Sequence, residues 1–277
     1  MKTRLLTAAI ALPILIASII LPWWVPDTIW IFVVIAVLAL AAGMFEFFSL
    51  TKKLELKGDA GVAYLGAAGL IVLFVLDAPR QDPSLLLIVL AGFLVVVFIT
   101  QTFRFQKDFS RMLAGMGVTA LGVLYVAFLG GFLIATRVGF DHILSTKLLF
   151  FFFVVIFGSD AGQYFVGKAL GKRKLAPAIS PGKTIEGAVG GLFAAAGFAA
   201  LCTLTFFPEL SYKFSIPLGI AMAALGMFGD LAESAIKRGS KTKDAASILP
   251  GHGGLLDRLD SLLFNAPLLY YFARFYF

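Results

Sequence analysis

Apolar runs long enough to cross a lipid bilayer as helices recur from one end of this 277-residue chain to the other. About 20 such residues are needed for each helical span. Overall, 60% of the residues are apolar and only 14% are charged, so a soluble core is excluded. We expect an all-α, polytopic integral membrane protein with about nine transmembrane helices. The expected spans are residues 5–22, 28–50, 62–78, 84–102, 112–136, 147–168, 184–207, 216–236 and 253–275.

The basic residues indicate the orientation of these spans. With a cytoplasmic N-terminus, 18 of the 23 Lys and Arg residues fall in inner segments, as the positive-inside rule requires. The outer segments hold Arg80, Arg137, Lys147, Lys213 and Arg274. The net charge of +7 therefore reflects topology, and no nucleic-acid partner is expected because the basic residues are scattered over short loops. We predict a multi-pass protein of the cell inner membrane, with its active site on the cytoplasmic side.

The chain is expected to form one membrane domain, residues 1–277. The first apolar run is interpreted as a retained span, because it is long for a signal peptide and no small-x-small cleavage site follows Trp23-Trp24. Residues 1–146 are expected to be mainly scaffold; their main intramembrane acid, Glu46, is interpreted as a snorkelling surface acid. Residues 147–277 are expected to form the catalytic half, because the acids gather there: Asp160, Glu186, Asp230 and Glu233.

The eighth expected span carries one polar stripe. Asp230, Glu233, Ser234 and Lys237 are spaced i, i+3, i+4 and i+7, so they share a helix face. Buried acids need a cation or a proton. One alternative is an internal ion pair between these acids and Lys237 or Arg238. Glycines in the spans, such as Gly226, are interpreted as close-packing positions.

A second acidic cluster opens the last expected span. Asp257, Arg258 and Asp260 follow the turn Gly251-His252-Gly253-Gly254, and the two acids project from the same side of a helix. An ordinary acidic helix N-terminus is the alternative. The two clusters lie on consecutive spans joined by one inner loop, so they can converge. Mg²⁺ favours one or two carboxylates with phosphate oxygens and water, which this arrangement offers.

The loop between the clusters is basic. Three of its basic residues, Lys237, Arg238 and Lys243, are interpreted as ligands of phosphate oxygens, with Arg as a bidentate fork and Lys as a point charge. The alternative is an anchor on anionic lipid headgroups. His252 could serve as a phosphate ligand or a proton-transfer group. The charged residues of this loop are Lys237, Arg238, Lys241, Lys243 and Asp244.

Another anion site is expected before the seventh span, in Ile179-Ser-Pro-Gly-Lys-Thr-Ile-Glu-Gly187. Its Gly182-Lys183-Thr184 end is not a P-loop, because Pro177 stands where the first Gly is needed and no preceding strand is expected. What remains is a Pro-ordered turn that places Ser180, Lys183 and Thr184 beside a helix N-terminus. Glu186 in the first turn complements the helix dipole.

These segments together resemble the phosphatidate cytidylyltransferases (CDP-diacylglycerol synthases). The resemblance covers roughly the last 120 residues, and Gly182 departs from it because relatives often carry Lys or Asn there. The downstream residues that carry it are Ser234, Lys237, Arg238, Lys243, Asp244, Pro250, His252, Gly253, Gly254, Asp257, Arg258 and Asp260. The upstream ones are Ser159-Asp-Ala-Gly-Gln-Tyr164, Gly167, Gly171, Lys174-Leu175, Pro177 and Ile179-Ser-Pro-x-Lys-Thr-Ile-Glu-Gly187.

The resemblance implies a Mg²⁺-dependent enzyme that converts phosphatidate and CTP to CDP-diacylglycerol and pyrophosphate. Asp230 and Asp257 are then expected to hold Mg²⁺, with a second cation such as K⁺ nearby, and a homodimer is expected. Phosphate contacts are assigned to Lys237, Arg238, Lys243 and Arg258, and further catalytic positions are Asp244, His252 and Asp260. Substrate contacts are assigned to Ser180, Lys183, Thr184, Glu186, Asp160, Glu233, Ser234, Gly253 and Gly254.

Two other functions fit parts of the pattern. A CDP-alcohol phosphotransferase would need a D-x-x-D-G…G-x-x-x-D-x-x-x-D motif, which the chain lacks. A transporter would place acids near mid-bilayer and show inverted repeats. Here the acids cluster toward one face and no repeat is seen.

Overall fold

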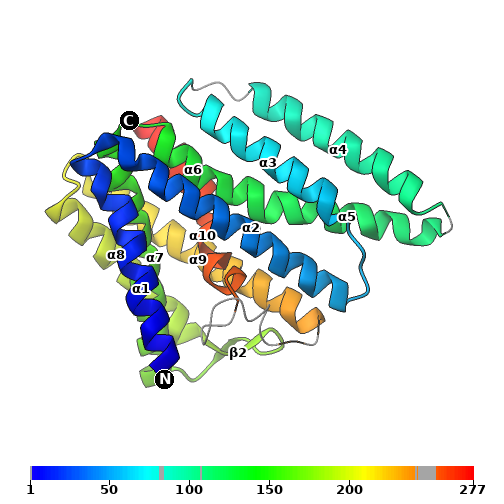
Figure 1. Ribbon diagram of the computed structural model, residues 1–277. Helices are drawn as coiled ribbons and strands as arrows, with labels where there is room; N and C mark the ends of the chain where they lie inside the picture. Colours follow the sequence, from blue (N-terminus) through cyan, green and yellow to red (C-terminus); the bar gives the residue numbers. More distant parts are fainter. Residues whose placement is uncertain (1, 81–83, 107, 241, 243–253) are drawn as a thin grey trace.

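The computed structural model describes residues 2–80, 84–106, 108–240, 242 and 254–277, with the backbone alone for residues 2–8. The chain is built almost entirely of helices (Figure 1). The α-helices are α1 (Lys2–Ile20), α2 (Ile29–Lys53), α3 (Ala60–Asp77), α4 (Ser84–Arg104), α5 (Met112–Gly122), α6 (Leu129–Val138), α7 (His142–Leu170), α8 (Ile185–Thr205), α9 (Tyr212–Gly239) and α10 (Leu256–Tyr276). A π-helical segment, Val123–Phe128, joins α5 to α6, and short 3₁₀ turns lie at Leu21–Trp23, Pro26–Thr28 and Phe109–Arg111.

Each of the nine predicted spans corresponds to one of these helical rods, with α5, the π-segment and α6 forming a single rod. In the described chain, seven rods are long and apolar enough to cross a membrane. The first predicted span contains a shorter apolar helix, Ala9–Trp23. The ninth corresponds to α10, which is more polar because it carries Asp257, Arg258, Asp260 and Arg274. An all-α, multi-pass membrane protein is therefore confirmed.

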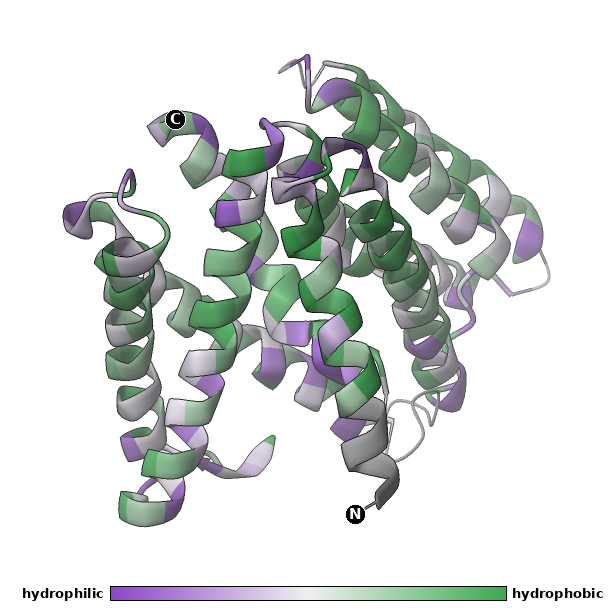
Figure 2. Ribbon diagram, turned by 60° about the vertical axis from the view of Figure 1, so that its left-hand side comes forward, coloured by the Kyte–Doolittle hydropathy of each residue, from purple (hydrophilic) through white to green (hydrophobic). Residues whose placement is uncertain are grey.

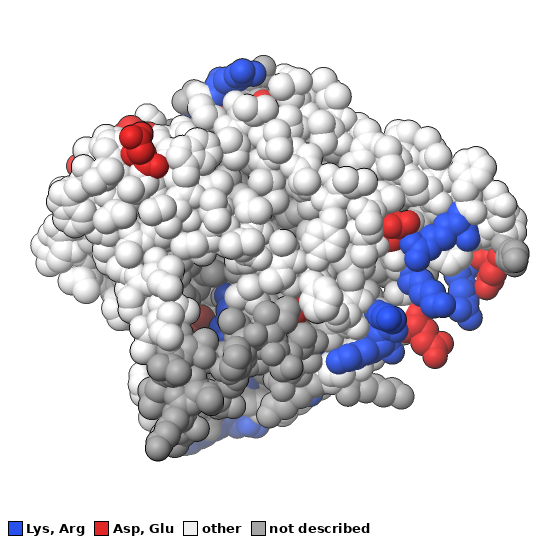
Figure 3. All heavy atoms as spheres, in the orientation of Figure 1, with Lys and Arg blue, Asp and Glu red and all other residues white. Residues whose placement is uncertain are grey.

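The distribution of polar residues fits a bundle in lipid. Hydrophobic residues cover most of the helices' length, and hydrophilic ones gather near the helix ends and in the lower middle of the bundle (Figure 2). On the face drawn in Figure 3, a broad uncharged band separates a few charges at the top from Lys and Arg toward the lower right. Large apolar side chains such as Leu65, Leu113 and Phe193 are exposed, as a lipid-facing surface requires.

One hairpin departs from the all-helical pattern. β1 (Lys174–Ala176) pairs antiparallel with β2 (Ser180–Thr184), with Lys174 opposite Thr184. The sequence predicts a turn at residues 180–184 and no strand before it. Both predictions are wrong, because β1 precedes these residues and they form β2. Pro177 and Pro181 mark the connection and the second strand, where a short edge hairpin tolerates proline. Thr184 ends β2 and caps α8 by accepting a hydrogen bond from the Gly187 N–H at 3.1 Å.

Small residues let the C-terminal helices approach closely. A Cβ added at Gly229 of α9 would lie 2.4 Å from the Asp260 carbonyl oxygen of α10. A Cβ at Gly226 would meet Asn265 Nδ2 at 3.2 Å, and one at Gly191 of α8 would meet Gln163 Cγ of α7 at 2.3 Å. The packing interpretation of Gly226 is thus confirmed. The same contacts bring the polar faces of α7, α8, α9 and α10 together.

The chain alternates between two ends of the bundle. One end collects the C-terminal ends of α2, α4, α7 and α9, and with them the β-hairpin and the start of α10. We call it the hairpin end; it holds the described segments that were predicted to be cytoplasmic. We call the opposite end the Arg137 end. There the fully buried Arg137 donates from Nη1 to Thr146 Oγ1 at 3.0 Å and from Nη2 to the Ser18 and Ile19 carbonyl oxygens at 3.2 Å each.

Candidate active site

A cavity of about 730 Å³ opens at the hairpin end, between α7, the hairpin, α8, α9 and α10. It is large enough for a small-molecule ligand and combines charged with apolar walls. Of the predicted site residues, it brings together Asp160, Ser180, Lys183, Thr184, Asp230, Lys237, Asp257, Arg258 and Asp260. The central expectation, that Asp230 and Asp257 face one site, therefore agrees with the geometry.

Asp230 forms one charged wall of the cavity with the hairpin. Lys183 Nζ of β2 lies 2.5 Å from Asp230 Oδ2, and Ser234 Oγ donates to Asp230 Oδ1 at 3.2 Å. The Asp230 side chain is 40% exposed. Lys183 lies 47 positions before Asp230 in the chain, so this ion pair holds β2 against α9. This wall can present both a carboxylate and an ammonium to a charged ligand.

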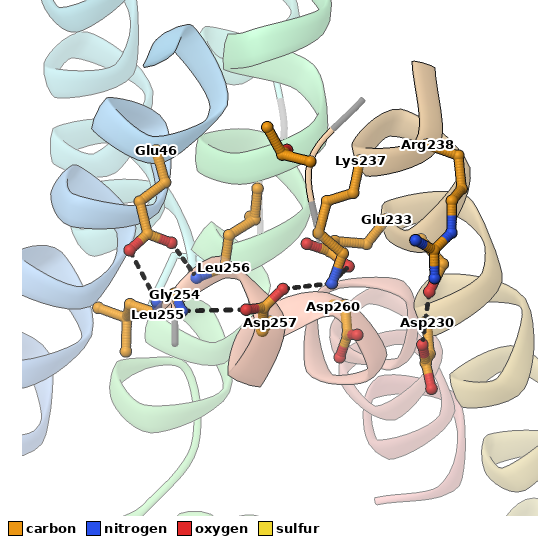
Figure 4. A network of polar contacts seen from close by, with 12 residues as sticks. Glu46, Asp230, Glu233, Lys237, Arg238, Gly254, Leu255, Leu256, Asp257 and Asp260 are labelled. Carbon is orange, nitrogen blue, oxygen red and sulfur yellow. Dashed lines mark hydrogen bonds and ion pairs between the residues drawn. The ribbon is translucent and has the colours of Figure 1, made fainter. Parts of the chain in front are cut away.

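Asp257 forms the second charged wall, around Lys237 (Figure 4). Lys237 Nζ lies 2.5 Å from both Asp257 Oδ1 and Glu233 Oε2. Asp257 Oδ2 accepts a hydrogen bond from the Gly254 N–H at 2.9 Å. The internal ion pair considered from the sequence is thus present, and it links the two acidic clusters. Glu233 is fully buried, so Lys237 neutralises a charge that water does not reach.

The oxygen ligands of this cavity fit Mg²⁺. Asp230 and Asp257 line one space, and each already holds a cationic ammonium at 2.5 Å. Within the described ranges no group of three or more His, Cys, Asp and Glu forms a ready-made metal cage. Mg²⁺ does not require one, since it commonly takes one or two carboxylates together with substrate phosphates and water.

Several predicted site residues lie elsewhere or have other partners. Glu186 was expected to line the cavity; instead it accepts hydrogen bonds from the Lys172 and Arg173 N–H groups at 3.0 and 3.1 Å. Arg238 Nε donates to the Ile179 carbonyl oxygen at 3.0 Å, which ties α9 to the hairpin. Both contacts shape the hairpin, because backbone groups there lack helical partners.

Glu233, Ser234 and Gly254 contact lining residues without lining the cavity themselves. Lys243, Asp244, His252 and Gly253 lie outside the described residues, so their assigned contacts stay predictions.

Two residues near the site were missed or misjudged from the sequence. Gln163 lines the cavity from α7 and donates to Asp160 Oδ1 at 3.3 Å. Glu46, predicted to be a surface acid, is fully buried, so that prediction is wrong. Its two oxygens accept hydrogen bonds from the Leu255 and Leu256 N–H groups (Figure 4). Helical spacing within one span gave no signal for this contact, because the partners of Glu46 lie 209 and 210 positions away along the chain.

Comparisons with known proteins find relatives along nearly the whole chain. The model of the cytidylyltransferase family matches residues 2–276. A phosphatidate cytidylyltransferase of Bacillus subtilis (strain 168) is 34% identical over 276 residues, which is 98% of this chain and 97% of that protein. One of Staphylococcus aureus (strain COL) is 33% identical over 275 residues, 97% of each chain. One of Haemophilus influenzae is 43% identical over 134 residues, 47% of this chain and 46% of its own. Because the family model and two relatives match nearly the full length of the chain, the chain belongs to the cytidylyltransferase family.

Proposed function

We propose that the chain transfers a cytidylyl group from CTP to phosphatidate in the cavity at the hairpin end, producing CDP-diacylglycerol and pyrophosphate. The observation that carries this proposal is the convergence of Asp230 and Asp257, each with a lysine partner, on one cavity. The full-length relatives named phosphatidate cytidylyltransferase support the substrates. The chain is therefore a membrane-embedded nucleotidyltransferase.

The chemistry needs charge neutralisation more than proton transfer. A phosphate oxygen of phosphatidate forms a new bond to the α-phosphorus of CTP, and the bond from that phosphorus to the β-phosphate bridging oxygen breaks. Pyrophosphate leaves with the electron pair of that bond. The attacking oxygen is already anionic, so no strong general base is required. Positioning and electrostatic stabilisation then supply most of the rate enhancement.

Particular side chains suit these tasks. Asp230 and Asp257 would hold Mg²⁺, which supplies positive charge to the triphosphate when bound. Lys183 and Lys237 line the same cavity and would bind phosphate oxygens. Arg258 lines the same cavity and offers a bidentate fork. Two exposed aromatic lining residues of α7, Phe157 and Tyr164, support sideways entry of the acyl chains.

The direct test uses purified full-length protein in detergent micelles with phosphatidate and radiolabelled CTP. We expect label in the lipid product, stoichiometric pyrophosphate, and loss of both when Mg²⁺ is chelated. Asp230→Asn and Asp257→Asn should each lower this rate by roughly 100-fold or more, the size seen when a charge-stabilising group is removed. A wild-type protein that incorporates no label would overturn the proposal, and full activity of either variant would overturn the metal assignment.

The orientation and the assembly are parts of the same proposal. The hairpin end would face the cytoplasm, where CTP is found, because the basic segments lie at that end. A cysteine placed at Lys53 should then react with an impermeant thiol reagent only in inverted vesicles, and one at Lys213 only in intact cells. The chain would act as a homodimer, which light scattering of the detergent complex would test; a monomeric active enzyme would contradict this.

A transporter is the less favoured alternative. Its acids would lie near the middle of the bilayer. The described acids of the cavity lie instead toward the hairpin end: Asp257 and Asp260 are in the first two turns of α10, and Asp160 and Asp230 are in the halves of α7 and α9 nearer that end. CTP-dependent lipid labelling separates the two functions, because a transporter would show none.

A further inference from the structure

We infer that Glu46 of α2 is a positioning residue for the proposed reaction, acting as the N-terminal cap of α10 from a distant helix. Its Oε1 accepts the Leu255 N–H at 2.8 Å and its Oε2 the Leu256 N–H at 2.7 Å. The first N–H groups of a helix have no partner within that helix. Leu255, the N-cap residue, has no side-chain oxygen that could supply one. Glu46 supplies both acceptors and places a negative charge at the positive end of the helix dipole.

This cap determines how Asp257 is used. An acid in the first turn of a helix normally turns toward the unsatisfied N–H groups. Here Glu46 occupies the Leu255 and Leu256 N–H groups, and the one backbone N–H that Asp257 accepts among the described residues is that of Gly254, through Oδ2. Its other oxygen, Oδ1, is directed at Lys237 beside the cavity (Figure 4). Glu46 thus leaves one oxygen of Asp257 available to a cation.

Burial makes the contact stiff. The Glu46 side chain is 0% exposed, and it lies on the helix face of α2 that packs on the π-segment and α10. A Cβ at Gly43, one turn earlier on α2, would lie 3.2 Å from Leu259 Cδ1, so α2 and α10 approach closely here. A buried carboxylate with two N–H donors is a strong, charge-assisted contact. It fixes the start of α10 where Asp257 and Asp260 must point into the cavity.

The inference rests on the proposed function and adds that the N-terminal half sets the site's geometry. Partners that orient a metal ligand from behind typically change metal affinity or activity by about 10–100-fold when removed. We therefore expect Glu46→Gln, which keeps the shape but turns one acceptor into a donor, to lower kcat by about tenfold or more. It should also raise the Mg²⁺ concentration needed for half-maximal rate. Glu46→Asp, which retains the charge, should recover part of both.

Asp77→Asn is the matched control. Asp77 is also a buried acid that accepts a backbone N–H of another helix, Leu86 of α4, at 3.2 Å. It lies at the Arg137 end, away from the cavity. Asp77→Asn should lower the melting temperature in detergent about as much as Glu46→Gln does. It should leave kcat and the Mg²⁺ dependence of the folded enzyme unchanged.

The outcomes separate this inference from the proposed function. Absence of wild-type activity refutes the function, whereas an active wild type with Glu46→Gln at normal kcat and Mg²⁺ dependence refutes the inference. Equal shifts in Mg²⁺ dependence for Asp77→Asn would also refute it. If the Glu46 variants do not fold, amide hydrogen exchange of the wild type decides. The Leu255 and Leu256 amides should be protected without CTP or Mg²⁺, and rapid exchange would overturn the cap.

Discussion

The two ends of the bundle bury charge in different ways. At the hairpin end, Glu233 and Asp257 share Lys237, and Asp230 holds Lys183, all beside an open cavity. At the opposite end, all four hydrogen bonds that Arg137 makes among the described residues go to neutral oxygens of hydroxyl and carbonyl groups. Its guanidinium also lies 5.9 Å from the centre of the Phe32 ring.

This difference indicates which buried charges could exchange their protein partners for a bound ligand. A carboxylate–ammonium pair beside a cavity can open when a metal ion and a phosphate replace the two partners. The Arg137 guanidinium has no such replacement, because it joins the end of α1 to α6 and α7 in a dry interior. It also satisfies carbonyl groups that the C-terminal end of α1 leaves without helical partners. On the proposed function, the hairpin end carries the chemistry, whereas the Arg137 end holds α1, α6 and α7 together.

The largest expected effect is that of Lys237→Met at the hairpin end. Removing this lysine leaves the buried Glu233 without a counter-ion, which costs about 3–5 kcal/mol of folding free energy. Activity should be lost as well. Adding Glu233→Gln should recover most of the melting temperature but not the activity, as CTP-dependent labelling and thermal unfolding would show. Recovery of activity in the variant with both substitutions would mean that Lys237 has only a structural role.

Arg137→Met should have the second largest effect, on stability alone. The Ser18 and Ile19 carbonyl oxygens lose their donor, at a cost of about 1.5–3 kcal/mol, the range for hydrogen bonds to charged groups. Activity per folded molecule should stay within about twofold of wild type, because Arg137 lies at the opposite end from the cavity and distant sites without shared partners act independently. A selective loss of kcat would break the proposed division between the two ends.

Gly229→Ala and Gly219→Ala compare close packing at the two ends of α9. A Cβ at Gly229 would lie 2.4 Å from the Asp260 carbonyl oxygen, and one at Gly219 would lie 3.0 Å from the Ala195 carbonyl oxygen. Each substitution should cost about 1–3 kcal/mol by overpacking. Only Gly229→Ala should also lower kcat, since it pushes α9 from α10 beside Asp230. An equal loss of kcat in the two variants would show that the distance between α9 and α10 at the cavity does not control the rate.

Glu209→Gln should have the smallest effect. Lys147 Nζ lies 2.5 Å from Glu209 Oε1 in the α8–α9 loop, and this hydrogen bond holds the pKa of Glu209 below its ordinary value. Glu209 is 54% exposed, so the pair contributes about 0–1 kcal/mol. The pKa of Glu209 is lower in the folded state than in the unfolded state, where it is about 4.3, so the ion pair stabilises the fold at pH values above the unfolded pKa. This stabilisation is lost as the pH falls through the folded-state pKa. The melting-temperature difference between wild type and variant should thus vanish in acid; a difference that grows there would contradict this sign.

Much of the bundle could be predicted from local pattern. Helix type, span order and the clustering of basic residues follow from apolar run length and from where Lys and Arg stand. The spacing of Asp257 and Asp260 correctly placed both on one helix face toward a cavity. The hairpin at 174–184 was not predicted, because its strands are short, contain Pro181 and are held by contacts such as that of Arg238 with the Ile179 carbonyl oxygen.

The sequence alone determined that the chain lies in a membrane, how its helices alternate, and which acids and lysines stand near helix ends, because these depend on composition and spacing within one segment. Only the tertiary structure decided which charge meets which. Lys183 pairs with Asp230, Lys237 joins Glu233 to Asp257, and Glu46 caps α10 across 209 positions of chain. A buried charge takes the nearest complementary group in space, and that distance exists only after the helices have packed.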